Sequence, residues 1–224
     1  MSTSAGPGRT RGRPIDAELE QRVFEAAIRV YGEVGWAGFT FDAVAARARA
    51  GKASIYRRWE SKLDILLDAL RAANAGFVEV PDTGELRADL VSLARAIMVR
   101  FDQPVGLAEL RLMVDMKAFP EEFSSLRPTG TVSRRIAREA VDRAVARGEL
   151  PAGTRPEIVF DLVRGAVVQN FLLVPPGMED AWRDRCPAFA EEIVDTVLAG
   201  LNACSPGGPS TAEPAPAEGS ANAE

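Results

Sequence analysis

The sequence predicts an all-α protein of about nine helices arranged in two domains. Three observations predict this fold class. Apolar residues recur at intervals of three and four, a spacing that places them on one face of a helix. No stretch shows the apolar–polar alternation of a strand, and no segment is repeated elsewhere in the chain. Prolines and glycines divide the helical patterns into segments of ordinary helix length.

The first long helix is expected from Asp16 to Val34. Its apolar positions fall on one face, which Phe24 and Ile28 widen. Gly35 is expected to end the helix, because glycine readily adopts the left-handed conformation common just after a helix. The residues that define the apolar face are Val23, Ala26, Ala27, Val30 and Tyr31.

Two short helical patterns follow between residues 39 and 66, separated by a tight break at Arg49-Ala50-Gly51. Thr40 is a suitable N-cap for the first, because its side-chain oxygen can accept a free backbone amide hydrogen. In the second, Lys52 to Trp59, the apolar side chains share one face and leave cations, a hydroxyl and a phenol elsewhere. Two short helices across such a turn predict a helix-turn-helix, whose second helix lies in the major groove of DNA.

This stretch resembles the DNA-binding domain of the tetracycline-repressor (TetR) family of transcriptional regulators. The resemblance runs from about Ile15 to Leu70 and includes FEAAIRVYGEVGW, the Thr40-Phe41 entry, SIYRRW at 54–59 and the pair Ser61-Lys62. Three positions depart from the family pattern, namely Arg49 and Ala53 in place of glycine and Gly51 in place of serine. A left-handed backbone at Arg49 would cost about 1–2 kcal/mol relative to glycine.

The resemblance also implies which residues face DNA. Lys52 and Ser54, near the start of the second short helix, are expected to influence base preference, whereas Lys62 is expected to contact phosphate. The positions that match the DNA-facing residues of the family are Thr40, Lys52, Ala53, Ser54, Tyr56, Arg57 and Lys62.

Residues 1–14 contain three arginines and no acidic residue, and this composition predicts disorder. Arg11-Gly12-Arg13-Pro14 resembles the core of an AT-hook, a short arm that enters the narrow minor groove of A·T-rich DNA. Arg11 and Arg13 are therefore candidate DNA contacts. The alternative is a solubilising tail, and the sequence does not separate the two.

The net charge of −5 is unevenly distributed. Residues 1–75 carry 12 Lys and Arg against 9 Asp and Glu, whereas the remainder carries 15 against 23. A basic head on an acidic body suits a protein that meets phosphates with one end. No apolar run approaches the ~18 residues of a membrane helix, and the N-terminus resembles no secretory signal, so we expect a cytoplasmic protein.

The chain contains no histidine, which excludes Ser-His-Asp and Cys-His catalysis and the His-Glu-x-x-His zinc site. Cys186 and Cys204 fit no metal or redox motif. No glycine-rich phosphate loop and no catalytic cluster of carboxylates or lysines stands out. We therefore expect neither enzyme activity nor a cofactor nor a metal.

Beyond the helix-turn-helix, Ser61 and Asp64 have capping-box spacing for a helix that continues to about Phe77. Thr154 and Glu157 have the same spacing at the start of a later helix. The remaining helices are expected at 86–101, 107–119, 132–148, 154–173 and 188–201, with an irregular joint at 120–130.

The helix at 158–173 is apolar on more than one face, which indicates burial on more than one side. In the TetR family the last two long helices pair with those of a second subunit, and the resemblance implies the same for 158–173 and 188–201. The alternative is a helix central to its own monomer. The candidate interface residues are Ile158, Leu162, Val163, Val167, Ile193, Val194, Val197, Leu198 and Leu201.

The family places a small-molecule pocket among the helices that follow the DNA-binding domain. Methionine and phenylalanine suit such adaptable apolar cavities, although most are expected to be ordinary core. Gln169 and Asn170 lie in an apolar helix, where they could orient a ligand or pair across a dimer. The candidate effector-binding residues are Phe77, Met98, Phe101, Met113, Met116, Phe119, Phe123, Gln169 and Asn170.

Taken with the resemblance, the sequence predicts a ligand-responsive transcriptional regulator, most often a repressor in this family. It would bind a palindromic operator as a homodimer and be released by a small apolar effector. Two alternatives remain: a helical enzyme or binding protein for an apolar metabolite that keeps a helix-turn-helix, and an architectural DNA binder without an effector. The expected organisation is a basic arm (1–14), a DNA-binding domain (15–62), an effector and dimerisation domain (63–201) and a disordered tail (202–224).

Overall fold

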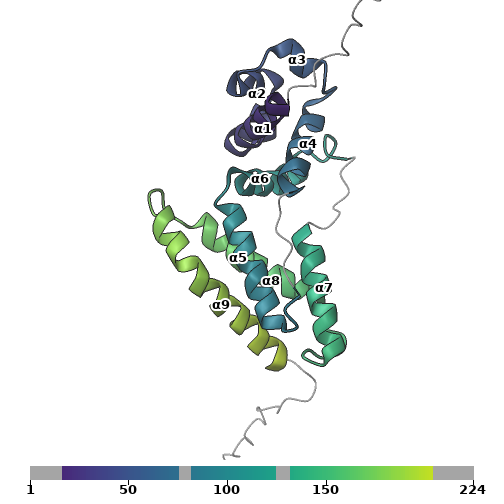
Figure 1. Cartoon of the computed structure of the whole chain (residues 1–224), viewed down its shortest axis with the longest axis vertical. Coiled ribbons are helices and arrows are strands. Elements are labelled where there is room, and N and C mark those ends of the chain that lie inside the picture. Colours follow the sequence, from purple (N-terminus) through teal and green to yellow (C-terminus); the bar gives the residue numbers. More distant parts are fainter. Residues whose placement is uncertain (1–16, 76–81, 125–131, 204–224) are drawn as a thin grey trace, which may run out of the picture. The chain divides into compact units, whose positions relative to one another are not determined.

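The structure, a computed structural model, describes residues 17–75, 82–124 and 132–203. Within these ranges every regular element is an α-helix, which confirms the all-α prediction (Figure 1). The helices are α1 (Ala17–Gly38), α2 (Phe41–Ala48), α3 (Lys52–Tyr56), α4 (Lys62–Ala75), α5 (Leu86–Phe101), α6 (Pro104–Ala118), α7 (Val132–Arg147), α8 (Pro156–Leu172) and α9 (Glu179–Ala203). Arg11, Arg13 and Phe77 lie outside the described residues.

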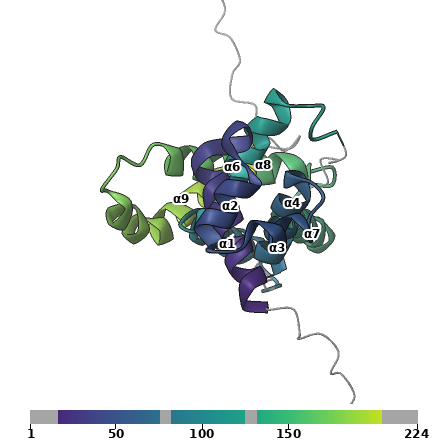
Figure 2. The same ribbon diagram turned by 90° about the horizontal axis from the view of Figure 1, so that it is seen from above.

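The described residues form two compact units. Unit 1 comprises α1 to α4, the last part of α5 from Arg95 and α6, whereas unit 2 comprises the first part of α5, most of α7, α8 and α9. In unit 1, α1 lies between the α2–α3 pair and α6 (Figure 1), and the perpendicular view shows α1, α2 and α6 stacked (Figure 2). The predicted boundary between residues 62 and 63 stays a prediction.

Gly35 interrupts α1 with a left-handed backbone (φ 64°), so the regular helix ends at Val34 as the sequence predicted. One further turn follows and carries Trp36 into the core of unit 1. Glycine is favoured here for two reasons. The backbone has a positive φ, and the Cβ of any other residue would lie 3.2 Å from the Arg111 guanidinium.

An aromatic cluster fills the space beneath the helix-turn-helix. Tyr31 and Phe39 are fully buried, with ring centroids 5.5 Å apart. Trp36 contacts Phe39 on one side and Phe123 on the other, with its centroid 4.7 Å from that of Phe123. Since a fully buried aromatic side chain contributes roughly 1.5–3 kcal/mol through the hydrophobic effect, this cluster is a main support of α2 and α3.

Two of the predicted helix caps are confirmed and one is wrong. Thr40 Oγ1 accepts the Ala43 amide at 3.1 Å, and Ser61 Oγ accepts the Asp64 amide at 3.2 Å while Asp64 accepts the Ser61 amide at 2.9 Å. The predicted cap at Thr154 is not formed, because Arg155 is the N-cap residue of α8, and the Thr154 hydroxyl donates to the Pro151 carbonyl at 2.8 Å. Helix α8 begins one residue later, with Arg155 as its N-cap and Pro156 in the first turn.

In unit 2, α9 starts at Glu179, well before the predicted start at 188, and continues through Pro187 to Ala203. A proline inside a helix removes a backbone hydrogen bond and costs about 3 kcal/mol. The segment before Pro187 is nevertheless held, because Trp182 is buried and its indole N–H donates to Asn170 of α8 at 2.8 Å. At the other end, Asp195 accepts two hydrogen bonds from Arg87 of α5.

Candidate DNA-binding surface

Helix α3 is short and presents two unlike sides. Ile55 points into the core, whereas Lys52, Ala53, Tyr56 and Arg57 are exposed and Ser54 is half-buried. The exposed side offers an ammonium group, a guanidinium, hydroxyls and an aromatic ring. These groups can donate to phosphates and to the base edges of a major groove.

The recognition residues are oriented by neighbours in α2. Lys52 Nζ pairs with Asp42 at 2.8 Å, and both side chains are more than half exposed. The hydrogen bond and the charge of Asp42 raise the pKa of Lys52. The ring of Tyr56 packs against Phe41 with centroids 4.8 Å apart, which directs it away from the core. Thr40 stands exposed at the start of α2, beside the same surface.

Lys62, at the start of α4, makes contacts within the protein that the sequence did not predict. Its ammonium group donates to the Trp36 carbonyl at 2.8 Å and lies 3.9 Å from the centroid of the Trp36 ring. Burial lowers the pKa of Lys62, and Glu122 and Asp115 act in the opposite direction. A phosphate contact at this position stays a prediction, and it would have to share or replace the bond to Trp36.

Asp115 of α6 is a supporting residue that sequence reasoning missed. One of its oxygens accepts the Tyr31 hydroxyl at 2.8 Å and the Trp36 amide at 2.8 Å, on the two sides of the Gly35 kink. Arg111, one turn earlier, donates to the carbonyls of Gly32 and Glu33. Burial and the bond to Asp115 strongly raise the pKa of Tyr31. No sequence signal points to these contacts, since Trp36 lies 79 residues and Tyr31 lies 84 residues before Asp115 in the chain.

Two family descriptions match the chain. Residues 23–69 match the bacterial regulatory proteins of the tetR family, and residues 80–197 match the tetracyclin repressor-like C-terminal domain. The chain belongs to the TetR family. It is therefore a DNA-binding transcriptional regulator, as the helix-turn-helix predicted, and its relatives are regulators rather than enzymes.

The relatives of this TetR-family chain cover most of its length. The HTH-type transcriptional regulator AqdR of Rhodococcus erythropolis is 31% identical to this chain. The matched region covers 70% of this chain and 76% of AqdR. The DNA-binding transcriptional repressor TetR of Mycobacteroides abscessus is 29% identical over 77% and 87%.

Solved structures agree on the fold. FadR of Bacillus subtilis in complex with stearoyl-CoA has a TM-score of 0.52 at 14% identity, covering 80% of this chain and 98% of its own. SmeT, the repressor of the Stenotrophomonas maltophilia multidrug efflux pump SmeDEF, has a TM-score of 0.51 at 17% identity, covering 82% and 91%. At such identities the likeness shows the fold alone. Among the described residues no helix is long and apolar enough to cross a membrane.

The candidate effector residues of this TetR-family chain differ in their burial and in their partners. Met98 and Phe101 are buried in α5, whereas Met113 is half exposed on α6. Gln169 is exposed, and Asn170 accepts the Trp182 indole hydrogen bond. Three further candidates pack against the core beneath the helix-turn-helix: Met116, Phe119 and Phe123.

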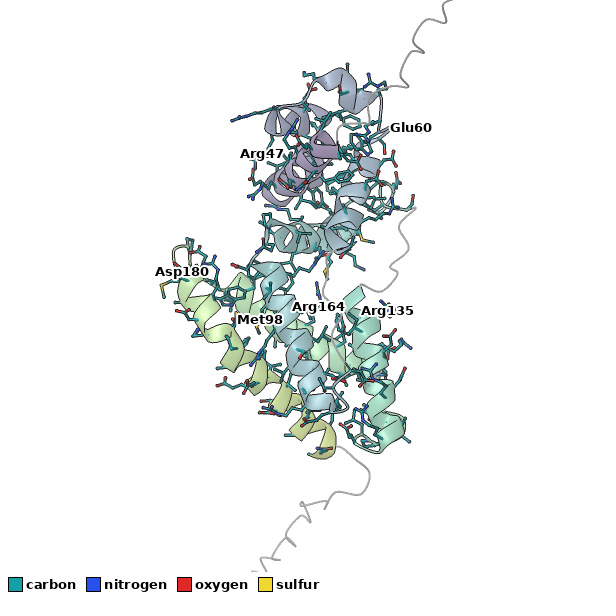
Figure 3. All side chains as sticks on the ribbon, viewed as in Figure 1. Arg47, Glu60, Met98, Arg135, Arg164 and Asp180 are labelled. Carbon is teal, nitrogen blue, oxygen red and sulfur yellow. The ribbon has the colours of Figure 1, made fainter. Side chains whose placement is uncertain are left out.

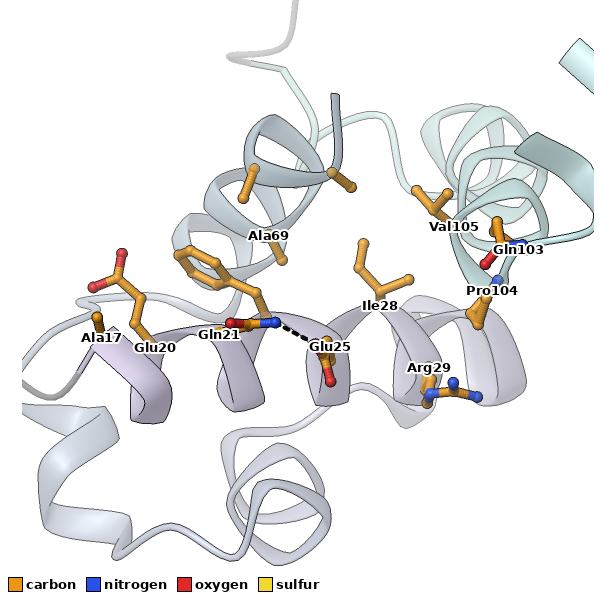
Figure 4. A pocket seen from close by; sticks show the side chains of 13 residues that line it. Ala17, Glu20, Gln21, Glu25, Ile28, Arg29, Ala69, Gln103, Pro104 and Val105 are labelled. Atoms are coloured by element: carbon orange, nitrogen blue, oxygen red, sulfur yellow. Dashed lines mark hydrogen bonds between the residues drawn. The ribbon is translucent and has the colours of Figure 1, made fainter. Parts of the chain in front are cut away.

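A groove of about 710 Å³ lies between α1, α4 and the start of α6 in unit 1 (Figure 4). Its lining includes the apolar Phe24, Ile28 and Val105 and the polar Glu20 and Gln21. None of the predicted effector residues lines this groove. The effector site therefore stays a prediction.

The candidate dimer residues divide into two groups. Val163, Val167, Ile193 and Val194 are buried within unit 2, where α8 packs against α9. The alternative weighed from the sequence, a helix central to its own monomer, therefore applies to this side of α8. The other candidates are open or half open to solvent: Ile158, Leu162, Val197, Leu198 and Leu201.

Proposed function

We propose that the protein is a repressor that binds a palindromic operator as a homodimer and leaves it on binding a small apolar effector. Because operators are in the cytoplasm of bacteria, we propose that the protein acts there. The observation that carries the dimer is an exposed apolar stripe on α8.

The stripe runs along one side of α8. Ile158, Leu162 and Leu172 are 42%, 50% and 56% exposed, and the exposed Gly165 and Gln169 lie between Leu162 and Leu172. These positions are separated by three or four residues, so they lie above one another on one helix face. Contiguous exposed leucine and isoleucine are unusual on a monomer and indicate a surface covered by a partner.

A second copy of the chain suits this stripe. Two α8 helices related by a two-fold axis would each cover the other's leucines, and Gly165 would let the backbones approach closely. A two-fold dimer presents two copies of α3, which would enter successive major grooves about 34 Å apart. The operator would then be palindromic. A single α3 of five residues offers few contacts, so the pair is needed for tight binding.

Two observations support an apolar effector. FadR, which shares the fold, was solved with stearoyl-CoA, a ligand with a long hydrocarbon chain. The chain itself carries methionine and phenylalanine on α5 and α6, which suit adaptable apolar contacts. Differential binding of such a ligand to one dimer geometry would shift the population away from the DNA-bound state.

The test is a selection of random DNA with the purified full chain, followed by sequencing of the bound fragments. We expect an enriched palindrome with half-site centres one helical turn apart, bound by two subunits as measured by light scattering. Adding a series of acyl-CoA thioesters of increasing chain length to that complex should release the DNA.

Three outcomes would oppose parts of this proposal. Enrichment of single half-sites by a monomer would oppose the dimer. Binding without sequence preference would favour an architectural role. A palindromic complex that no apolar ligand of the series dissociates would remove the support for an acyl effector.

A further inference from the structure

A hollow of about 370 Å³ lies between α1 and the end of α2, on a part of unit 1 that the predicted DNA contacts do not include. Four arginines and one glutamate line it together with two alanines. Figure 4 shows one of them, Arg29, projecting away from α4, and Figure 3 shows Arg47 at the edge of the α1–α2 pair. We call this surface the arginine groove; it is lined by Arg22, Glu25, Ala26, Arg29, Arg47, Ala48 and Arg49.

Half of the positive charge in the arginine groove is uncompensated. Arg47 donates to both carboxylate oxygens of Glu33 at 2.6 Å. Arg22, Arg29 and Arg49 are exposed, and their guanidinium groups make no hydrogen bond or ion pair with the described residues. Glu25 is hydrogen-bonded to Gln21 and offsets only one of these charges. Arg22 and Arg29 are seven residues apart, so their Cα atoms lie about 10 Å from each other along one side of α1.

The backbone at Arg49 is an independent observation. Arg49 caps α2 in the left-handed region, with φ 52° and ψ 43°, and it is the non-glycine residue with a positive φ among those described. A residue with a Cβ is strained there, whereas glycine is not. Packing does not account for the arginine, because its side chain is exposed. A strained backbone at a residue whose side chain has no packing role points to a functional contact.

We propose that the arginine groove seats the phosphate backbone of the DNA strand that borders the major groove occupied by α3. In a helix-turn-helix the first helix of the pair crosses the backbone while the second enters the groove, and Arg49 stands only three residues before Lys52. Guanidinium groups bind phosphate oxygens bidentately. The lining has no aromatic side chain on which a base could stack, so it fits backbone rather than bases or a nucleotide.

This inference rests on operator binding by a dimer and predicts its salt dependence. Each phosphate contact contributes about 0.9 to the slope of log affinity against log salt. Loss of the Arg49 contact in both subunits should therefore lower the slope by about 1.8 and weaken binding equally for all sequences.

The test compares Arg49→Gly and Arg49→Ala with wild type on the selected operator between 50 and 200 mM salt. Arg49→Gly removes both the guanidinium and the strain, whereas Arg49→Ala removes the guanidinium and keeps the Cβ. We expect both variants to lose the same part of the slope, and the melting temperature of Arg49→Gly to equal or exceed that of wild type. Arg49→Lys, which keeps the charge, should retain most of the slope. Lys117→Ala, an exposed cation on α6, is the matched control and should leave it unchanged.

The outcomes separate this inference from the proposed function. If wild type selects no DNA, the proposed function fails. If wild type selects an operator and Arg49→Gly binds it with the same slope, the arginine groove has no phosphate contact and the inference is overturned while operator binding stands. A change in preferred bases for Arg49→Gly would also overturn it, because a backbone contact carries no sequence preference.

Discussion

Helices α3 and α8 both expose one side to solvent, and the two exposed sides differ in chemistry. The side of α3 carries Lys52, Tyr56 and Arg57, whereas the side of α8 carries Ile158, Leu162 and Leu172. Charged and hydroxyl groups are well solvated in the free protein, so a surface of this kind can meet a polyanion and leave it again. Exposed leucines are poorly solvated, and a surface of this kind suits a lasting partner.

The supports of the two helices differ as well. Helix α3 has five residues and is too short to be stable alone, so Ile55 and the nearby Trp59 hold it on the aromatic core. Helix α8 has 17 residues and is anchored along its buried side by Val159, Val163 and Val167. The predicted DNA-binding surface therefore depends on the core of unit 1, whereas the proposed dimer would depend on one face of a helix that is held in its own unit.

The largest effect is expected from Leu162→Glu. Leu162 is 50% exposed, so the glutamate would be solvated in a monomer but buried without a partner in an α8–α8 interface, where breaking contact costs several kcal/mol. We expect a folded monomer in light scattering whose affinity for the palindrome falls at least about 100-fold. Val99→Glu makes the same change at a 66% exposed valine of α5 and should leave both properties intact. A dimeric Leu162→Glu protein would place the interface elsewhere.

Asp115→Ala breaks the support of α3 without touching its exposed side. The Tyr31 hydroxyl and the Trp36 amide would lose their shared acceptor, and each bond contributes about 1–1.5 kcal/mol net because Asp115 is only half-buried. The free energy of unfolding, measured with urea, should fall by about 2–3 kcal/mol. Tyr31→Phe removes only one of the two bonds and should cost about 1 kcal/mol. Equal stability of wild type and Asp115→Ala would show that the aromatic core suffices.

Asp42→Asn is expected to strengthen DNA binding, whereas the two preceding substitutions weaken assembly or stability. Asp42 pairs with Lys52 in the free protein and places a negative charge on the surface that is predicted to face phosphates. Because exposed ion pairs contribute only about 0–1 kcal/mol, stability should change little. Removing the carboxylate should raise operator affinity by about three- to tenfold, measured by fluorescence anisotropy at fixed salt. A loss of affinity would indicate that Asp42 orients Lys52 for its contact.

The smallest effect concerns alkaline pH. The pKa of Tyr31 is raised in the folded protein, so folding favours the neutral phenol. Its contribution to stability is therefore present below the unfolded pKa of about 10 and is lost as pH rises above it. Above pH 10 wild type should lose stability faster than Tyr31→Phe, by at most about 1.4 kcal/mol per pH unit. Parallel urea stabilities of the two proteins from pH 8 to 11.5 would contradict this.

Helix caps and helix breaks could be predicted from the sequence where the interacting residues are only a few positions apart. Thr40 and Ser61 cap their helices because their partners are three residues away, and Gly35 breaks α1 because glycine alone tolerates that backbone. The prediction for Thr154 was wrong because α8 begins with Pro156 in its first turn, which makes Arg155 and not Thr154 the N-cap residue. Methionines and phenylalanines could not be divided between core and cavity, since both environments select the same apolar side chains. Phe123, for example, packs on Trp36.

The sequence by itself determined the helical class and the helix-turn-helix, because helical periodicity, caps and glycine breaks are short-range features. Its resemblance to the TetR family indicated the family. The tertiary structure alone decided which groups separated in the chain meet. It brought Asp115 to Tyr31 and Trp36, placed Arg49 beside Arg22, and gave Trp182 the partner that lets α9 start before Pro187. It also decided which side of α8 is buried, because an evenly apolar helix carries no periodic signal that distinguishes its faces.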